Sequence, residues 1–314
     1  MSFVVVGAGF VGVCVAYELA RAGLPVEILD SSAGVPPATA RSLAWFGAVS
    51  GGTWPRGSED LLHLVLDDHR RLAAEVPGAA YRWTGSLDWP PPAVIAPGMR
   101  LVDRDTVAAM EPHLREVPEA ALHIPTDAGL DPLTAVPAIL RAAQRLGARY
   151  RPHTPYREQD VPAGATVIFA AGVSTPEVAG VDLPIGTSAA FGMRFAGPPG
   201  LVRHIVAAPG LVVREARPGR YLLITRGDPA ACLDRFREIF RVDGTLRPLS
   251  CGTVLRAAPA SGPLVGAVGP GRYVAVLHAG ITFAPTVGRL LATELRTGEP
   301  APELHRCRPA RSAP

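Results

Sequence analysis

The first 30 residues restrict the fold of this chain more than any other feature of its sequence. They contain, in order, an apolar run, a glycine-rich turn, a helix-forming stretch and a second apolar run that ends in an acid: residues 3–6, Gly7-x-Gly9-x-x-Gly12, 13–23 and 26–29, with Asp30. This order is that of a βαβ unit, in which two parallel strands flank one helix. The sequence therefore predicts an α/β protein built on a parallel sheet.

The glycine turn also predicts a nucleotide site. The first glycine permits a tight turn, the second lets the backbone approach a pyrophosphate, and the third allows close helix–strand packing. The N–H groups that open the helix would meet the phosphates, and the acid would accept from a ribose hydroxyl. The expected contacts are Gly7, Gly9, Phe10, Val11, Gly12, Asp30 and Ser31. The acid favours FAD or NAD over NADP, and an ordinary βαβ turn without a ligand is the alternative.

Composition excludes several classes of chemistry. All 31 basic residues are arginine and none is lysine, so a pyridoxal-phosphate Schiff base, a P-loop lysine and a lysine general base are ruled out. The net charge is only +3 and no long basic run occurs, which disfavours nucleic-acid binding. The apolar fraction of 48% is enough for a sizeable core in one large or two connected domains.

The cysteines and the N-terminus bear on the compartment. Cys14, Cys232, Cys251 and Cys307 form no C-x-x-C pair and show no metal-ligand spacing, so we expect no metal site. Scattered thiols of this kind are typical of a reduced, cytoplasmic protein. Residues 1–17 are uncharged but too short and glycine-broken for a membrane span.

Two later segments add to the first motif. Residues 165–172 form a buried-strand pattern that ends at Ala171 and Gly172. Residues 254–266 and 273–285 form a third segment, with a buried strand at 273–277. Helices are expected over 59–75, 132–146 and 286–296, and the Pro- and Arg-rich tail from Gly298 is expected to fray.

In this order the segments resemble the FAD-dependent D-amino-acid oxidase, glycine oxidase and sarcosine oxidase family over essentially the full length. Further landmarks of the resemblance are Glu111-Pro112, Gly129-Leu130-Asp131-Pro132, the stretch 147–156 and the loop 39–47. The resemblance implies FAD as the cofactor.

The resemblance assigns roles to individual residues. Cofactor contacts are implied for Arg41, Ser42 and Ala44 under the pyrophosphate, Tyr156 near the adenine, Ala171 and Gly172 near the flavin, and Gly280, Ile281 and Thr282 around its pyrimidine end. Arg256 would pair with a substrate carboxylate, because a guanidinium fork matches a planar carboxylate. His278 is the second catalytic candidate, as a base beside the flavin; a packed, flavin-adjacent histidine is the alternative.

The chain departs from the family pattern at two informative positions. Leu211 is expected where relatives place a tyrosine that helps hold the carboxylate. Val254 stands where flavin-linking relatives carry a cysteine, so the FAD is expected to be noncovalent.

The expected architecture is an FAD-binding Rossmann-like domain with a central parallel sheet and a smaller antiparallel, β-rich substrate domain. The FAD domain would comprise 1–78, 127–184 and 246–314, and the substrate domain 79–126 and 185–245.

The implied reaction passes hydride from the C–H beside nitrogen of an amino acid or amine to the flavin, and the imine product is then hydrolysed. O2 or another electron acceptor would reoxidise the flavin, and a homo-oligomer is compatible with the family. Alternative functions are oxidation of a 2-hydroxy acid, tailoring of a biosynthetic amine, or a flavin-holding electron-transfer subunit.

Overall fold

Two sheets organise the computed structural model, which describes residues 2–48, 57–225 and 229–310. The first sheet has six strands, in the spatial order β15 (Leu264–Gly269), β16 (Arg272–Val276), β9 (Thr166–Phe169), β1 (Phe3–Val6), β2 (Val26–Leu29) and β8 (Arg149–Arg151). All neighbours are parallel except β15 and β16, so the expected parallel sheet is confirmed and carries one antiparallel edge.

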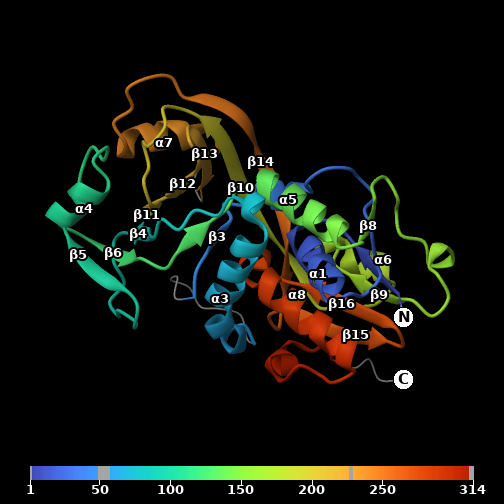
Figure 1. The fold of residues 1–314 in the computed structure, drawn as a ribbon. Coiled ribbons are helices and arrows are strands. Elements are labelled where there is room, and N and C mark those ends of the chain that lie inside the picture. The colour runs from blue at the N-terminus through green and yellow to red at the C-terminus, as the bar shows by residue number, and fades with distance from the viewer. Residues whose placement is uncertain (1, 49–56, 226–228, 311–314) are drawn as a thin grey trace.

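Helices cover one face of this sheet (Figure 1). They are α1 (Phe10–Arg21), α3 (Glu59–Glu75), α5 (Pro132–Arg145) and α8 (Gly280–Thr297). Alternate residues of each strand face opposite sides, so Phe3 and Val5 pack under the helices and Val4 and Val6 pack on the other face. Both faces are buried, which explains why the strands are apolar throughout.

The second sheet has eight strands and is mostly antiparallel. Its spatial order is β14 (Arg247–Pro259), β10 (Ile185–Ala196), β13 (Arg220–Thr225), β12 (Leu211–Arg217), β11 (Ile205–Ala208), β4 (Ser86–Asp88), β6 (Ala120–Ile124) and β5 (Arg100–Asp103). It therefore has more strands than the first sheet, although we expected the smaller domain here. The helices α4 (Arg104–Met110) and α7 (Cys232–Ile239) lie at its far end from α1 (Figure 1).

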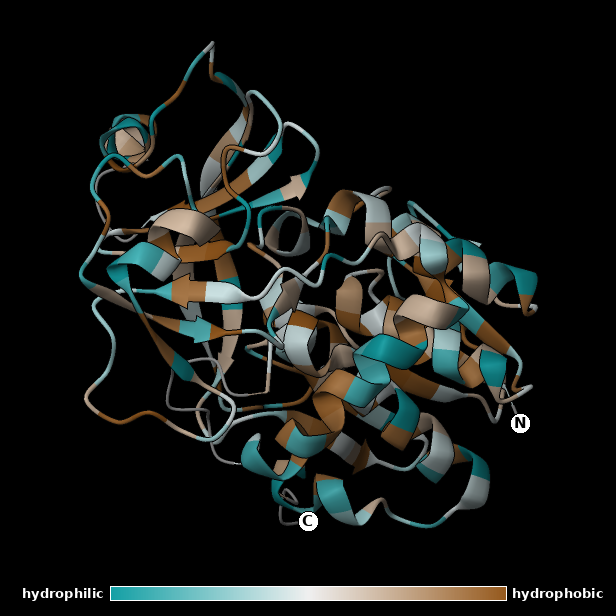
Figure 2. Ribbon diagram, turned by 60° about the vertical axis from the view of Figure 1, so that its left-hand side comes forward, coloured by the Kyte–Doolittle hydropathy of each residue, from teal (hydrophilic) through white to brown (hydrophobic). Residues whose placement is uncertain are grey.

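Shorter elements join the two layers. A two-stranded ladder, β3 (Trp45–Phe46) with β7 (Ala128–Gly129), lies between them. The remaining elements are α2 (Pro37–Ala40), α6 (Thr175–Ala179) and the 3-10 turns η1 (Pro77–Ala79), η2 (Glu158–Asp160), η3 (Gly172–Ser174), η4 (Pro229–Ala231) and η5 (Pro302–Cys307). Figure 2 shows apolar residues along the strands and on helix faces turned toward them.

The strands of the first sheet come from residues 3–29, 149–169 and 264–276, and those of the second sheet from 86–124 and 185–259. Residues 247–259 were expected in the FAD domain, but β14 pairs with β10 along its whole length and forms the edge of the second sheet. The helix expected at 286–296 is α8, which begins earlier, at Gly280. The tail does not fray up to residue 310, because Cys307 is buried and Arg308 pairs with Glu294.

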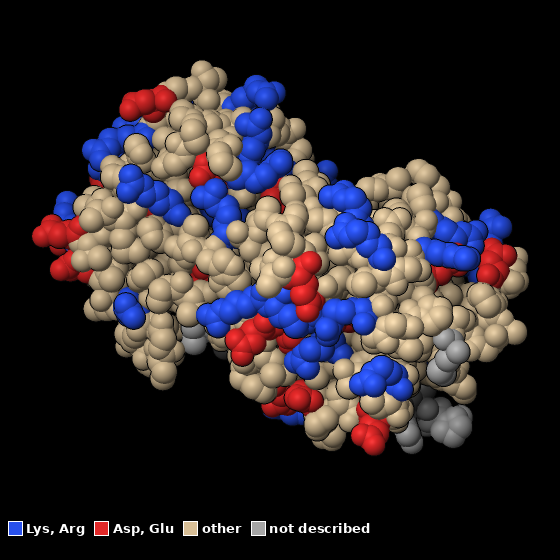
Figure 3. Space-filling view, in the orientation of Figure 1, with Lys and Arg blue, Asp and Glu red and all other residues tan. Residues whose placement is uncertain are grey.

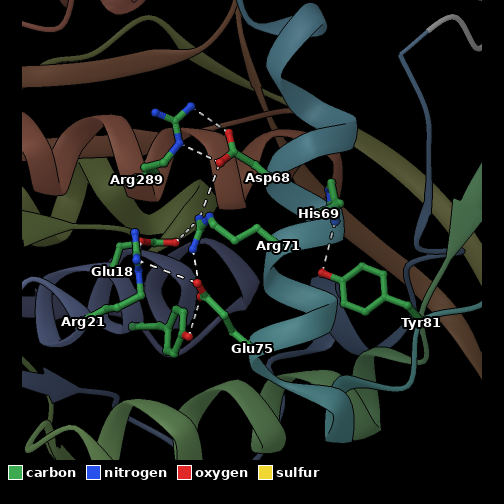
Figure 4. Close-up of polar contacts among 9 residues, drawn as sticks. Glu18, Arg21, Asp68, His69, Arg71, Glu75, Tyr81 and Arg289 are labelled. Atoms are coloured by element: carbon green, nitrogen blue, oxygen red, sulfur yellow. Dashed lines mark hydrogen bonds and ion pairs between the residues drawn. The ribbon is translucent and has the colours of Figure 1, made fainter.

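Charged side chains gather where α1, α3 and α8 meet. Arg71 of α3 contacts Glu18 of α1, and Arg289 of α8 pairs with Asp68 of α3 at 2.6 Å (Figure 4). Figure 3 shows arginine and acidic side chains intermixed on this face, which leaves no large single-sign surface in that view. No helix within the described ranges is long and apolar enough to span a membrane.

Candidate functional site

Two of the three glycines in the first turn are required by the protein itself. Gly7 has φ +106°, and a Cβ on it would lie 2.7 Å from the carbonyl oxygen of Ala170. A Cβ on Gly12 would lie 1.9 Å from the Gly7 oxygen. Both contacts are closer than side chains tolerate, so these glycines allow β1, β9 and α1 to meet. They also place Ala170 and the following Ala171 beside the turn.

Gly9 differs from its neighbours. Its φ of −68° suits any residue, and among the described atoms a Cβ there would meet only the Thr39 hydroxyl, at 3.4 Å. The protein around Gly9 therefore tolerates a side chain. The predicted approach of a ligand to the backbone at this point would account for the glycine.

The start of α1 fits an anionic group. Val13 N donates to Gly9 O in the first helical bond, so the earlier N–H groups have no helical acceptor. One of them, Phe10 N, donates a long hydrogen bond of 3.4 Å to Thr39 Oγ1. The first turn, which lies fully within the described residues, contains no acid. This helix end would hold a pyrophosphate without repulsion.

Asp30 is tied to the glycine turn by protein donors. Its Oδ2 accepts from Ala8 N at 2.7 Å, and its Oδ1 accepts from Ser32 N and Ser32 Oγ at 2.9 and 2.8 Å. A carboxylate can accept about four hydrogen bonds, so one more donor can be accommodated. The ribose contact predicted for Asp30 stays a prediction, as does that of the exposed Ser31 beside it.

The loop 41–44 is held from the second sheet. Ala44 has φ +52°, and its N–H donates to Ser42 Oγ at 3.0 Å. The Leu43 carbonyl accepts from Arg214 Nε of β12 at 2.6 Å, and the same guanidinium also donates to the Leu130 carbonyl. Arg214 is fully buried, and burial lowers its pKa to about 9. The sequence did not single out this arginine, because nothing local distinguishes it from the others.

Arg41 lies against a glycine pair of the second sheet. Gly192 of β10 and Gly252 of β14 are cross-strand partners. A Cβ on Gly192 would lie 2.5 Å from the Arg41 carbonyl oxygen, and one on Gly252 would lie 3.4 Å from Arg41 Nε. The loop therefore contacts this face of the sheet, which we call the inner face, through two residues without side chains.

Arg256 lies on the inner face, four residues along β14 from Gly252. Its Nη2 donates to Ser188 Oγ of β10 at 3.0 Å. Its Nε is buried and has no partner among the described residues, and burial lowers the pKa of the guanidinium. Val254 and Ala190, a cross-strand pair, lie between Arg256 and the glycine pair. The inner face therefore carries a guanidinium beyond a floor of small apolar residues.

His278 is linked to Arg256 through the neighbouring residue. The imidazole Nδ1 lies 3.0 Å from the Ala257 carbonyl oxygen, and since a carbonyl only accepts, Nδ1 must carry the proton. In the neutral imidazole the lone pair is then on Nε2. The two catalytic candidates thus lie near each other, at the end of β14 and just after β16.

Leu211 lies on the face of the second sheet opposite to the inner face. Its side chain is buried in the outer core of the second sheet with Val213, Tyr221 and Phe236. Strand alternation turns its neighbour Val212 to the inner face, where Val212 packs with Leu43 and Trp45. On β12 the inner face is therefore formed by Val212, while Leu211, expected at the place of the family tyrosine, points into the outer core.

The remaining predicted residues join the same region. A Cβ on Gly280 would lie 3.2 Å from Val11 Cγ2, so the start of α8 lies beside the start of α1. η3, which begins at Gly172, contacts β14. Tyr156 packs edge-on against Phe169 at 5.1 Å. The fold therefore gathers the glycine turn, η3 and the first turn of α8 at the carboxyl ends of β1, β9 and β16.

One buried residue at this place was missed by the sequence analysis. His69 of α3 stacks on Phe46, with ring centroids 3.7 Å apart and an interplanar angle of 9°. Its Nε2 lies 3.0 Å from the Thr282 carbonyl oxygen, and its Nδ1 lies 3.1 Å from the Tyr81 hydroxyl. Within the described ranges no group of His, Cys, Asp or Glu side chains could hold a metal ion.

These features define a nucleotide-binding α/β enzyme with a second sheet laid over the cofactor end. The profile of the family described as FAD dependent oxidoreductase matches residues 2–294, so the chain belongs to that family and uses FAD. No curated protein matches the chain in sequence.

Solved structures share this fold at low sequence identity. An L-amino acid deaminase from Proteus vulgaris, with its specific insertion deleted, superposes with a TM-score of 0.84 at 20% identity, over 98% of this chain and 92% of that one. Glycine oxidase from Geobacillus kaustophilus gives 0.82 at 19%, over 100% and 99%. Iminodiacetate oxidase from Chelativorans sp. BNC1 gives 0.80 at 21%, over 99% and 100%.

Proposed function

We propose that this FAD-dependent oxidoreductase oxidises the carbon–nitrogen bond of an amino acid or a related amine, and that Arg256 binds the substrate carboxylate. The observation that carries the proposal is the state of Arg256. Its guanidinium is half-buried, donates to a neutral hydroxyl and has an unpartnered, buried Nε. Burying a cation is costly unless an anion accompanies it. A substrate carboxylate supplies that anion and can accept from the fork in two parallel bonds.

Other buried arginines differ from Arg256 because protein groups satisfy them. Arg194, on the same strand as Ser188, is paired with Asp131 at 2.7 Å, and Arg214 donates to two carbonyls. Arg256 is distinguished because burial is the one cause that shifts its pKa, and no acid of the described chain raises it. Its environment is therefore that of a binding group whose partner is a ligand.

The chain's own residues have a positioning role in the reaction. Bound FAD supplies the hydride acceptor, so the hard chemistry belongs to the cofactor. Arg256 and Ser188 would fix the carboxylate, and the floor formed by Ala190 and Val254 would orient the substrate carbon. His278 Nε2, with its lone pair, would accept a proton from an ammonium substrate; a substrate that binds as the neutral amine needs no such base.

The related proteins support the same class of substrate. The solved relatives are named as acting on amino acids or on iminodiacetate, each of which carries at least one carboxylate beside an amine. We propose O2 or another acceptor for flavin reoxidation and noncovalent FAD. The inner face of the second sheet would be the substrate-binding side of the molecule.

An anaerobic screen tests the proposal. Purified protein reconstituted with FAD is mixed with amino acids, N-methyl amino acids, amines and 2-hydroxy acids, and loss of flavin absorbance is followed. Bleaching by a carboxylate-bearing amine, and not by its decarboxylated analogue, is the expected result. Bleaching by 2-hydroxy acids alone would mean that the enzyme oxidises the alcohol of a 2-hydroxy acid and not an amine. No bleaching by any compound, with reduction by a partner protein instead, would favour an electron-transfer subunit.

A further inference from the structure

His69 joins two segments that are expected to contact the flavin from different directions. On one side its ring stacks on Phe46 of β3, the strand that follows the loop 41–44. On the other side its Nε2 reaches the Thr282 carbonyl in the first turn of α8. The residue is 0% exposed, and the bond to Thr282 spans 213 positions of the sequence. A contact of this kind fixes the distance between the loop and the turn.

The hydrogen bonds determine the protonation state of His69. A carbonyl oxygen can only accept, so Nε2 carries the proton and donates it to Thr282 O. Nδ1 is then unprotonated and accepts from the Tyr81 hydroxyl (Figure 4). Burial lowers the pKa of His69 to about 4, which keeps the imidazole neutral near pH 7. The ring is therefore held in one tautomer and one orientation.

A proline removes one backbone hydrogen bond from the start of α8. Pro285 lies inside the helix and has no N–H, so the Ile281 carbonyl loses its ordinary helical partner. The imidazole Nε2 of His69 donates to the next carbonyl, that of Thr282, so His69 links α3 to the first turn of α8 beside the point where the proline interrupts the helical hydrogen bonds.

We propose that His69 is a positioning residue, which holds the turn Gly280–Thr282 in the place where it contacts the pyrimidine end of the flavin, with Tyr81 fixing the imidazole. The proposal rests on FAD binding and on the expected role of Gly280, Ile281 and Thr282. It does not depend on which substrate is oxidised. Backbone N–H groups that open α8 would favour negative charge on that end of the ring, so their placement sets how readily the bound flavin is reduced.

The test compares two replacements of His69. His69→Phe keeps an aromatic ring against Phe46 but loses both hydrogen bonds. His69→Gln loses the stack but keeps a donor for Thr282 and an acceptor for Tyr81. His63→Gln is the matched control, because this histidine lies on the same helix and is exposed. FAD affinity, the absorption spectrum and the reduction potential of the bound flavin are measured for each, together with the thermal midpoint of the apoprotein.

We expect His69→Phe to bind FAD roughly ten-fold more weakly or worse, the effect of one buried group left unpaired. Its bound flavin should show a lower reduction potential and a shifted spectrum, and His69→Gln should restore most of both. The proposal is overturned if His69→Phe lowers the apoprotein midpoint but leaves affinity, spectrum and potential unchanged. It is also overturned if Gln and Phe behave alike. Failure of every substrate in the bleaching screen would leave these flavin measurements intact, so the two proposals fail separately.

Discussion

Ser188 and Arg256 face each other across the β10–β14 ladder, and the serine hydroxyl is the one hydrogen-bond partner that the described chain gives the guanidinium. A neutral hydroxyl orients a guanidinium without neutralising it. The pair therefore presents a directed positive charge on the inner face.

Replacing Arg256 should separate substrate binding from cofactor binding. We expect Arg256→Ala to lower kcat/KM for a carboxylate-bearing amine by roughly a few hundred-fold, because one partner of a desolvated charge pair is lost. FAD content should stay normal. Arg256→Lys should recover only part of the activity, since an ammonium cannot form the fork. Arg247→Ala, an exposed position on the same strand, is the control. Normal turnover by Arg256→Ala would remove the carboxylate assignment.

The glycine turn gives a prediction in which neighbouring positions behave differently. Gly9→Ala should yield stable apoprotein with little FAD, because the chain tolerates a Cβ there and the pyrophosphate does not. The larger Gly9→Val should bind still less. Gly12→Ala should fail to fold or lose much stability, because its Cβ would overlap the Gly7 oxygen. Flavin absorbance per protein and apoprotein melting measure both effects. Full flavin occupancy in Gly9→Val would mean that the phosphates bind elsewhere.

Two buried groups should give the stability opposite dependences on pH. The pKa of His69 is about 4 in the folded chain against 6.5 ordinarily, so the unfolded chain binds more protons and stability rises from pH 4 to 6.5. Burial raises the pKa of Asp127 to about 6 from 3.8, so the folded chain binds more protons and stability falls over that interval. Each change is on the order of 3 kcal/mol, and the two largely cancel.

Single variants should reveal the two opposite pH dependences of the unfolding free energy, which cancel in the wild type. Asp127→Asn should steepen the rise of unfolding free energy with pH between about 4 and 6, and His69→Gln should flatten or reverse it. Urea unfolding at several pH values measures both. Asp67→Asn, with a side chain 84% exposed, is the control. If Asp127→Asn keeps the wild-type slope, the carboxyl is not protonated by burial as inferred.

Arg214 should matter to stability and to flavin retention together. Arg214→Met leaves the Leu43 and Leu130 carbonyls without their donor, which should cost about 3 kcal/mol. The freed loop 41–44 should release FAD faster. Arg220→Met on the neighbouring strand β13, where the guanidinium donates to the carbonyl of the adjacent Gly219, should change both much less. Equal effects at the two positions would argue against a specific hold on the loop.

Local patterns explain what the sequence could predict. The glycine turn, the strands at 3–6 and 166–169 and the helix at 59–75 follow from the order of neighbouring residues, and the structure confirms them. The start of α8 was misplaced because Pro285 ordinarily ends or begins a helix, whereas in this chain it lies inside one.

Long-range contacts explain which parts of the site the sequence could not predict. Arg214 reaches Leu43 across 171 positions, and no local signal marks either partner. Which side chain of β12 reaches the inner face depends on strand register, which sequence alone does not fix, because a shift of one residue turns a side chain to the opposite side.

The length of β14 has a consequence for how this enzyme can change. One continuous strand carries Gly252, which lies against Arg41 of the loop 41–44, and Arg256, which lies on the inner face. The next residue supplies the carbonyl that accepts from His278. Inserting a residue between Gly252 and Arg256 would rotate everything beyond it to the opposite face. The spacing of these residues along β14 must therefore stay constant. We expect changes of substrate to come from substitutions within the strand, and insertions or deletions to be confined to the turns outside it.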